Sequence, residues 1–363
     1  MNKKIAIFFL GDYRFDGRCC NMIETLTKKN KVTIYHNQDI NFSITNTNKN
    51  LIITNISISK IKWIKYIAWF WNIYKKNIFN YDQTIASDLY SLFPLACKQN
   101  KQNIIYDSRE IYTALAVHEN NKIKNYILSI IEKISLRKVR IIITTANTDQ
   151  EYLKKRYINY KNIKYYNVYN FPQKFDYKKN DFLREKLNIS SNNKILLYQG
   201  VIQKNRGITQ LIKIINNTEN ICGVIIGYGE YKKYFINMVN KMGLMKKIFF
   251  LEKTPYNKLL KITSSADIGF ALIPSVGISN NFALPNKLFE YSVAGVPTLA
   301  TPLPNMKKAI KKYNLGECID YNDLESQINF ILNIQKQNYF NNRIHEIQWS
   351  SQEELFNNII INE

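Results

Sequence analysis

The sequence predicts an α/β fold of two doubly wound domains, and three observations carry this prediction. Short apolar runs alternate with longer amphipathic stretches along most of the chain. Such alternation is typical of parallel sheets with helices on both faces. The alternation stops over residues 157–181 and then restarts, and a chain of 363 residues suits two cores. Such folds bind ligands at the carboxyl ends of their strands, so an interdomain cleft joining two such edges is the expected site.

The first half of the chain predicts five strands, because short apolar runs bounded by polar residues favour buried strands. These runs are Ile5–Leu10, Lys31–Tyr35, Gln83–Ala86, Ile104–Tyr106 and Arg140–Thr144. Apolar residues at helical spacing predict helices over Gly17–Lys29 and Lys122–Lys138. The first run is too short for a signal peptide and no cleavage site follows it, so a strand is expected there.

The second half repeats the alternation. Its predicted strands are Lys194–Tyr198, Cys222–Ile226, Ile248–Leu251, Ile268–Leu272 and Pro297–Ala300. Its predicted helices are Ile208–Asn216, Tyr231–Met242, Tyr256–Ser264, Lys287–Val293 and, in the tail, Ser351–Ile361. We therefore place an N-terminal domain at residues 1–170, a C-terminal domain at 171–340 and a last segment at 341–363.

The net charge of +23 is unevenly distributed. Residues 1–170 hold 27 Lys and Arg against 12 Asp and Glu, a net of +15, and residues 171–363 hold 24 against 16, a net of +8. Anionic lipid, nucleic acid and phosphorylated substrates all fit this charge, as does solubility alone. None of the five cysteines has zinc-ligand spacing, and three histidines are too few for a metal cluster. A reducing cytoplasm fits best, and no apolar run is long enough to span a membrane.

The segment Lys60–Lys76 reads KIKWIKYIAWFWNIYKK and holds three of the four tryptophans. On a helical wheel its aromatic and aliphatic side chains fill one half, with the lysines on the other. Trp69 falls among the lysines, where a core has little use for it. The pattern is typical of a helix lying in a membrane interface. The alternative is a helix that covers the first sheet, since the apolar arc also has the width for that.

The most informative stretch is Asn280–Tyr291, a polar loop followed by a helix that begins at Asn286. Lys287 and Glu290 are three residues apart and share one face near the helix N-terminus. Free backbone N–H groups and the positive end of the helix dipole point to the same place. Together these groups could hold a phosphate and a sugar hydroxyl.

Other polar groups also follow predicted strands. Gly200 follows one strand, and Arg206 stands at the start of the next helix, where its planar fork could bind phosphate. Gly227 and Gly229 form a second strand-to-helix turn without the third glycine of a dinucleotide fingerprint. Tight turns remain the alternative for both. Asp16 lies in the charged loop after the first strand, with a helix cap as its alternative.

The residues from Tyr198 to Asp320 resemble the C-terminal half of family 4 glycosyltransferases with the GT-B fold, and the type that assembles bacterial surface polysaccharide is the closest. The matching pieces are Tyr198-Gln199-Gly200 with Arg206-Gly207, Ile226–Gly229, Ser265–Gly269, Leu284–Tyr291 and Ala294–Pro297. The first half matches more weakly, at Asp16, Arg18, Tyr106–Glu110 and Val168–Pro172. The tail around Trp349 looks like the family's helix that returns to the N-terminal domain.

This resemblance implies two Rossmann-like domains facing a cleft. It implies a retaining hexosyl transfer from a nucleotide sugar, such as a UDP- or GDP-sugar, with no cofactor and no metal. The acceptor would be a glycan or a lipid-linked glycan in surface polysaccharide, lipopolysaccharide or capsule assembly.

The resemblance also assigns roles to residues. Arg206 and Lys287 would neutralise the pyrophosphate, and Glu290 would accept hydrogen bonds from the ribose. The turns at Gly200, Gly227 and Gly229 would let the backbone approach the nucleotide. Further expected contacts to the sugar or phosphate are Asn280, Asn281 and Asn286. The N-terminal domain would bind the acceptor, with Asp16, Arg109 and Glu110 at the cleft.

The chain departs from the family pattern at three positions. Phe282 stands where an acidic residue often lies, eight positions before the matching glutamate. Val201 replaces the first of two phosphate-binding basic residues. Arg109 replaces the histidine of Asp-Ser-His-Glu. Arginine cannot act as a neutral base near pH 7, although it could stabilise a developing phosphate charge.

Two other functions stay open from the sequence. A nucleotide-sugar epimerase of the same fold would need acid and base groups in the cleft. A basic protein that binds membrane or nucleic acid would use the charge, but no recognised nucleic-acid module is present, so nucleic acid is not an expected partner. We expect a cytoplasmic enzyme in peripheral contact with an anionic membrane on its cytoplasmic face.

Overall fold

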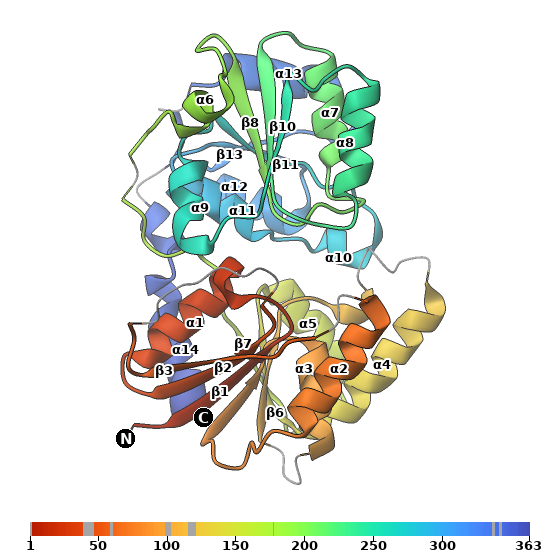
Figure 1. The fold of residues 1–363 in the computed structure, drawn as a ribbon, viewed down its shortest axis with the longest axis vertical. Helices are drawn as coiled ribbons and strands as arrows, with labels where there is room; N and C mark the ends of the chain where they lie inside the picture. Colours follow the sequence, from red (N-terminus) through yellow and green to blue (C-terminus); the bar gives the residue numbers. More distant parts are fainter. Residues whose placement is uncertain are drawn as a thin grey trace. The chain divides into compact units, whose positions relative to one another are not determined.

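The computed structural model describes residues 2–38, 47–58, 61–98, 103–114, 121–176, 178–335, 338–340 and 343–363. The chain divides into two compact units (Figure 1). Unit 1 comprises Met1–Asn170 with Gln352–Glu363, and unit 2 comprises Phe171–Ser351.

Unit 1 is built on a seven-stranded sheet in the order β3-β2-β1-β4-β5-β6-β7, in which every pair is parallel. Its strands are β1 Lys4–Phe9, β2 Lys31–His36, β3 Leu51–Asn55, β4 Gln83–Ala86, β5 Ile104–Ser108, β6 Val139–Thr144 and β7 Lys164–Asn167. At the centre, Ile7 pairs with Ile34 on one side and Ile85 on the other. Strands buried on both faces need such continuous apolar sequences.

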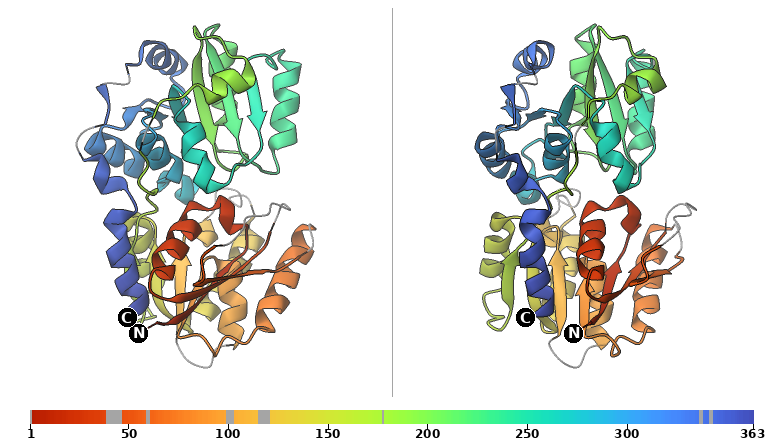
Figure 2. Two further views of the ribbon diagram at one scale, coloured as in Figure 1. Left: turned by 60° about the vertical axis from the view of Figure 1, so that its left-hand side comes forward. Right: turned by 90° about the vertical axis from the view of Figure 1, so that its left-hand side faces the viewer.

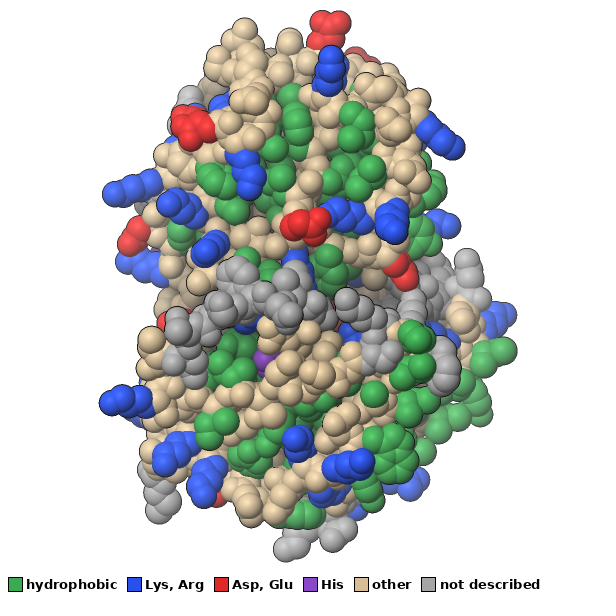
Figure 3. Space-filling view, viewed as in Figure 1, with side chains coloured by type: hydrophobic (Ala, Val, Ile, Leu, Met, Phe, Trp, Pro, Cys, Tyr) green, Lys and Arg blue, Asp and Glu red, His purple; other side chains and the backbone are tan. Residues whose placement is uncertain are grey.

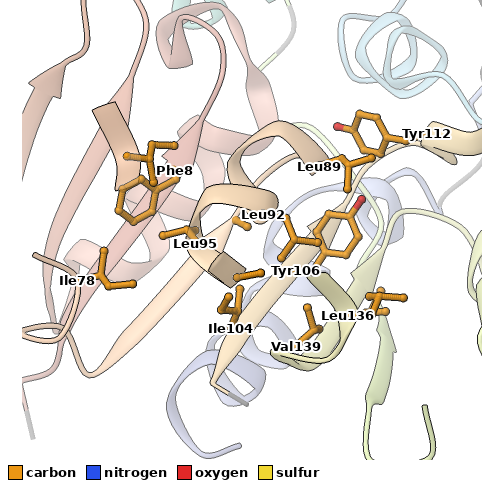
Figure 4. Close-up of a cluster of buried hydrophobic side chains, with 14 of the residues drawn as sticks. Phe8, Ile78, Leu89, Leu92, Leu95, Ile104, Tyr106, Tyr112, Leu136 and Val139 are labelled. Carbon is orange, nitrogen blue, oxygen red and sulfur yellow. The ribbon is translucent and has the colours of Figure 1, made fainter. Parts of the chain in front are cut away.

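The helices of unit 1 are α1 Gly17–Thr27, α2 Lys62–Tyr74, α3 Leu89–Lys98, α4 Lys122–Leu136 and α5 Asn147–Arg156, with short 3₁₀ turns at Tyr13–Phe15 and Tyr112–Ala114. α1 begins after Asp16 and α4 after Asn121, and each of these side chains accepts a backbone N–H of the first turn. α3 packs against both α2 and α4. Its leucines meet Phe8, Ile104 and Val139 of the sheet in the core of the unit (Figure 4).

The last helix, α14 (Ser350–Ile361), lies beside α1 (Figure 2). Thr25 Oγ1 donates to Glu353 at 3.1 Å, and Lys28 pairs with the same carboxylate. At the end of the chain, the Glu363 side chain accepts from Lys164 and Tyr166 of β7. These contacts fix the C-terminal segment to unit 1.

Unit 2 has a six-stranded parallel sheet in the order β10-β9-β8-β11-β12-β13. The strands are β8 Lys194–Gln199, β9 Ile221–Ile226, β10 Ile248–Leu251, β11 Ile268–Ala271, β12 Thr298–Ala300 and β13 Gly316–Cys318. The helices are α6 Phe182–Leu187, α7 Ile208–Asn216, α8 Lys232–Lys241, α9 Tyr256–Thr263, α10 Gly277–Asn281, α11 Asn286–Val293, α12 Pro304–Tyr313 and α13 Leu324–Asn333, with a 3₁₀ turn at Ile344–Ile347. α7 and α13 help to form one core, whereas α6, α9 and α11 contribute to a second.

The predicted fold class of two doubly wound parallel sheets is confirmed, and all ten predicted strands are present. Three strands were not predicted: β3, β7 and β13. Each lies at the edge of its sheet and is only partly buried. β7 (KYYN) and β13 (GEC) lack the apolar runs that mark central strands, whereas β3 (LIITN) contains such a run and was missed.

The helix predicted over Lys60–Lys76 is α2, which runs from Lys62 to Tyr74. Lys60 and the side chains of Lys62 and Trp63 lie outside the described residues. The placement of Trp69 among the lysines is wrong, because its side chain is fully buried and Nε1 donates to Ser91 Oγ at 3.2 Å. With Ile73, Trp69 packs in the core of unit 1, so α2 covers the sheet.

Candidate functional site

The carboxyl ends of β8 and β9 continue into two loops that pack against each other. Gly200 N donates to Ile226 O at 3.0 Å, and Ile202 N donates to Tyr228 O at 2.7 Å. A Cβ added at Gly227, where φ is +154°, would lie 1.9 Å from Gly200 O. A Cβ at Gly229 would lie 2.0 Å from Ile202 O. Both glycines therefore allow this close packing of backbone within their turns.

We predict that Gly227→Ala lowers the free energy of unfolding by about 3 kcal/mol, because a backbone loop must move to admit the methyl group. Gly243→Ala is the matched control, since its φ is also positive at +70° but no atom lies within 4 Å of the added Cβ. The control is expected to lose only about 1 kcal/mol from its backbone conformation. Urea unfolding of the two variants measures the difference, and equal losses would contradict the packing role.

Gly200 differs from the other two glycines, because a Cβ there would meet only the end of the Lys287 side chain, at 3.8 Å. Lys287 lies in the first turn of α11, and its Nζ lies 3.5 Å from the centroid of the Tyr198 ring. Burial and, to a lesser extent, the charge of Arg206 lower the pKa of Lys287 to about 7, against the opposing effect of Glu290. Arg206, in the loop before α7, thus lies near enough to Lys287 for the two cations to repel each other.

Glu290 is buried one turn after Lys287, and a chain of hydrogen bonds fixes its carboxylate. Gln199 Nε2 donates to Glu290 Oε2 at 2.5 Å, and Thr263 Oγ1 donates to Gln199 Oε1 at 2.8 Å. The Gln199 backbone N–H donates to Tyr291 Oη at 3.1 Å. Sequence reasoning missed the roles of Gln199 and Thr263. The one available signal was that Gln199 stands directly before Gly200.

The three asparagines expected to contact the sugar or phosphate have different surroundings. Asn280 is buried, and its Nδ2 donates to Pro274 O at 3.0 Å and to Asn205 O at 3.3 Å. Asn281 Oδ1 accepts from Ser275 Oγ at 2.6 Å. Asn286 is exposed at the start of α11. The first two lie in α10, a short helix within the stretch that was predicted to be a polar loop.

In unit 1, Asp16 belongs to a line of alternating charges. Asp16 Oδ1 caps α1 and accepts from Arg109 Nη1 at 2.8 Å. Arg109 Nε donates to Asp107 at 2.9 Å, and Arg18, which is buried, donates to the other side of Asp107 at 2.6 Å. Burial would raise the pKa of Asp107, but Arg18 and Arg109 outweigh it and the pKa is lowered. The helix cap proposed as the alternative for Asp16 is therefore present.

Glu110 is exposed after β5, and Asp149 lies nearby in the first turn of α5. Burial and, to a lesser extent, the negative charge of Glu110 raise the pKa of Asp149 to about 7. A carboxyl group with this pKa can hold or release a proton near neutrality. Sequence reasoning missed Asp149. Its signal was an acidic residue in the first turn of a helix that follows a strand.

Among the described residues, no group of three or more His, Cys, Asp and Glu side chains is arranged to hold a metal ion. The same part of the chain contains no helix with the length and apolar content needed to cross a bilayer. In unit 2 the structure brings together Gly200, Arg206, Lys287 and Glu290. In unit 1 it joins Asp16 to Arg109, with Glu110 near Asp149.

Residues 179–347 match the model of the family "Glycosyl transferases group 1". No curated protein matches the sequence. Sucrose-phosphate synthase from Thermosynechococcus elongatus is 14% identical over 99% of this chain and 98% of that one, with a TM-score of 0.77. HepE from Anabaena, in complex with UDP-glucose, is 13% identical over 100% of both chains, with a TM-score of 0.75. WaaG, a glycosyltransferase involved in lipopolysaccharide biosynthesis, is 14% identical over 99% of this chain and 100% of that one, with a TM-score of 0.68.

At these identities the likeness to solved structures shows the fold, which is GT-B, as predicted. The family match covers most of unit 2, including Arg206, Lys287 and Glu290. Residues 179–347 therefore form a glycosyltransferase group 1 domain, and the prediction that the protein is a glycosyltransferase is confirmed.

Proposed function

We propose that this enzyme transfers a hexose from a UDP- or GDP-sugar to a glycan or lipid-linked acceptor, with retention of configuration, as a family 4 glycosyltransferase. Its place would be the assembly of surface polysaccharide, lipopolysaccharide or capsule, at the cytoplasmic face of the membrane. HepE binds UDP-glucose and WaaG acts in lipopolysaccharide biosynthesis, and both support this choice of donor and setting. Nucleic acid is not a proposed partner.

The observation that carries the proposal is the pairing of two cations, Arg206 and Lys287, in unit 2. Like charges held together in a partly buried place need an anion to offset their repulsion. The pKa of Lys287 is low because burial and the charge of Arg206 together outweigh the opposing charge of Glu290. The diphosphate of a nucleotide sugar supplies two negative charges, and these increase on the leaving group as the sugar departs. Arg206 and Lys287 would stabilise that charge.

The remaining donor contacts follow from the same geometry. Glu290, oriented by Gln199, would accept hydrogen bonds from the ribose hydroxyls. Asn286 is exposed beside Lys287 and would meet the phosphate or sugar, as would Asn281. Asn280 would hold the loop that carries Arg206, because its amide is bonded to Asn205 O.

For the acceptor, we place the site in unit 1, around Asp16 and Glu110. Asp149 extends this proposal, because it would share a proton with Glu110 near neutral pH. Arg109 is bound by two carboxylates, so its role would be to hold Asp16 in place.

The proposal is tested by a screen of UDP-, GDP- and ADP-linked sugars for thermal stabilisation. The donor is expected to raise the melting temperature, because a ligand at a hundred times its Kd adds about 2.7 kcal/mol to stability. The stabilising sugar is then incubated with lipid-linked acceptors, and NMR of the product gives the configuration of the new bond. Transfer with inversion would overturn the retaining mechanism. Conversion of the sugar without an acceptor would indicate an epimerase.

A pH dependence follows from Lys287. With its pKa at about 7, the side chain is half neutral at pH 7 and mostly neutral at pH 8 or above. A bound diphosphate would restore the charge, so binding takes up a proton and weakens as pH rises through 7, by up to about tenfold per pH unit. Calorimetry of UDP or GDP binding from pH 6 to 9 measures this trend. Lys287→Arg, whose charge is constant over this range, is the control and is expected to show a flatter profile.

A further inference from the structure

The outward face of α4 is apolar. Ile123 is 75% exposed, and Ile127, Ile130 and Ile134 follow it at helical spacing, each also exposed. The opposite face of the helix, with Leu128 and Glu132, is buried against unit 1. A helix that covers a sheet normally turns its polar side to solvent. In α4 the core-facing side includes a carboxylate and the solvent side a row of isoleucines, so the apolar row serves something other than the core.

α2 carries a second apolar outward face. Trp69 and Ile73 point into the core, whereas Ile67, Trp71 and Tyr74 are exposed, with Trp71 at 52%. Trp71 and Tyr74 pack edge to face, at 5.8 Å between ring centroids. Tryptophan and tyrosine favour the boundary between lipid headgroups and acyl chains, because each joins an apolar body to a polar tip.

The two helices belong to one surface, since α3 packs against both. Figure 3 shows hydrophobic side chains gathered over α4 and α2, with Lys and Arg side chains among them. The helices α2, α3 and α4 contain a single acidic residue, Glu132, which is buried and accepts from Tyr106 and Tyr157. Their exposed charges and those just after them are all positive and include Lys75, Lys122, Lys133 and Arg137.

We propose that the outward faces of α2 and α4 form a docking surface for an anionic lipid bilayer. The isoleucines and Trp71 would enter the outer acyl region while the lysines contact headgroup phosphates. The exposed side chains of α2, α3 and α4 carry positive charge and no carboxylate, and this charge favours an anionic bilayer over a neutral one. The inference deepens the proposed function, on which it rests, because it brings unit 1 to the surface that holds a lipid-linked acceptor.

The test is flotation of the full chain with phosphatidylcholine vesicles, with and without phosphatidylglycerol. Binding is expected only with the anionic lipid and is expected to weaken with salt. The double variant Ile123→Glu and Ile127→Glu is expected to lose roughly tenfold or more in partitioning. Its matched control is Tyr234→Glu with Leu332→Glu, two exposed apolar positions in α8 and α13 of unit 2, which is expected to bind as the wild type does. Melting temperatures of both variants check that each is folded.

Tryptophan fluorescence gives an independent reading. Trp71 is expected to produce a blue shift on binding anionic vesicles, and Trp71→Phe is expected to lose most of that shift.

Failure of the wild type to float, or equal loss in the control variant, would overturn the proposal. So would a lipid-independent dimer that the Ile123→Glu and Ile127→Glu variant disrupts, because the surface would then join two copies of the chain. Transfer to a water-soluble acceptor separates the two proposals: flotation without transfer overturns the proposed function alone, and transfer without flotation overturns the docking surface alone.

Discussion

Arg206→Ala is expected to lower kcat by about 10²–10³, a loss of roughly 2.7–4 kcal/mol of transition-state stabilisation. The guanidinium can bind a phosphate through two parallel hydrogen bonds, and the negative charge there grows as the bond to the sugar breaks. Most of the loss is therefore expected in kcat, with a smaller change in the affinity for the donor. Single-turnover transfer with saturating donor measures the chemical step.

Lys287→Ala is expected to act in the same way, because we propose that both cations bind the same diphosphate. Lys204→Ala is the matched control, since Lys204 is an exposed lysine in the loop that carries Arg206. It is expected to retain wild-type turnover. Comparable losses in Lys204→Ala and Arg206→Ala would mean that general positive charge, and not the placed guanidinium, is responsible.

Asp107→Asn is expected to lower the free energy of unfolding by about 3–5 kcal/mol. Arg18 is 1% exposed, and its Nε and Nη2 donate to Asp107 at 2.8 and 2.6 Å, while Nη1 donates to Val168 O at 2.8 Å. The amide keeps the size of the carboxylate but removes its charge. The buried guanidinium then loses the anion that offsets its desolvation.

Urea unfolding followed by circular dichroism measures this loss. Glu252→Gln is the control, because Glu252 pairs with Lys232 but its side chain is 81% exposed. Exposed pairs contribute about 0–1 kcal/mol, so this variant is expected to unfold almost as the wild type does. A loss in Asp107→Asn no larger than that of the control would show that Arg18 finds its compensation elsewhere.

The central strands of both sheets could be predicted from sequence, because burial on two faces imposes an apolar run. The edge strands β7 and β13 could not be predicted, since their sequences are mixed, whereas β3 begins with an apolar run that was missed. Trp69 was misplaced for a related reason. A helical wheel gives the spacing of side chains but not which direction the core lies in, and the fold turned Trp69 toward Ser91.

The candidate donor site likewise contains some residues that the sequence could place together and others that only the fold brings together. Lys287 and Glu290 lie three residues apart, so helical periodicity placed them on one face before the fold was known. The hydrogen bond from Thr263 to Gln199 joins residues 64 positions apart, and only the packing of α9 against the end of β8 brings them together. Asp149 in α5 and Glu110 after β5 likewise come from different parts of the chain. Local pattern predicts local geometry, whereas contacts between elements require the fold.

The most direct test of the account is calorimetric titration of UDP and GDP into the wild type and the Arg206→Ala, Lys287→Ala double variant at pH 7. The wild type is expected to bind one of the two nucleotides and to take up protons as it does so. The double variant, with an unchanged melting temperature in the absence of nucleotide, is expected to bind at least about a hundredfold more weakly. Equal binding by the two proteins would contradict the assignment of Arg206 and Lys287 as the diphosphate site.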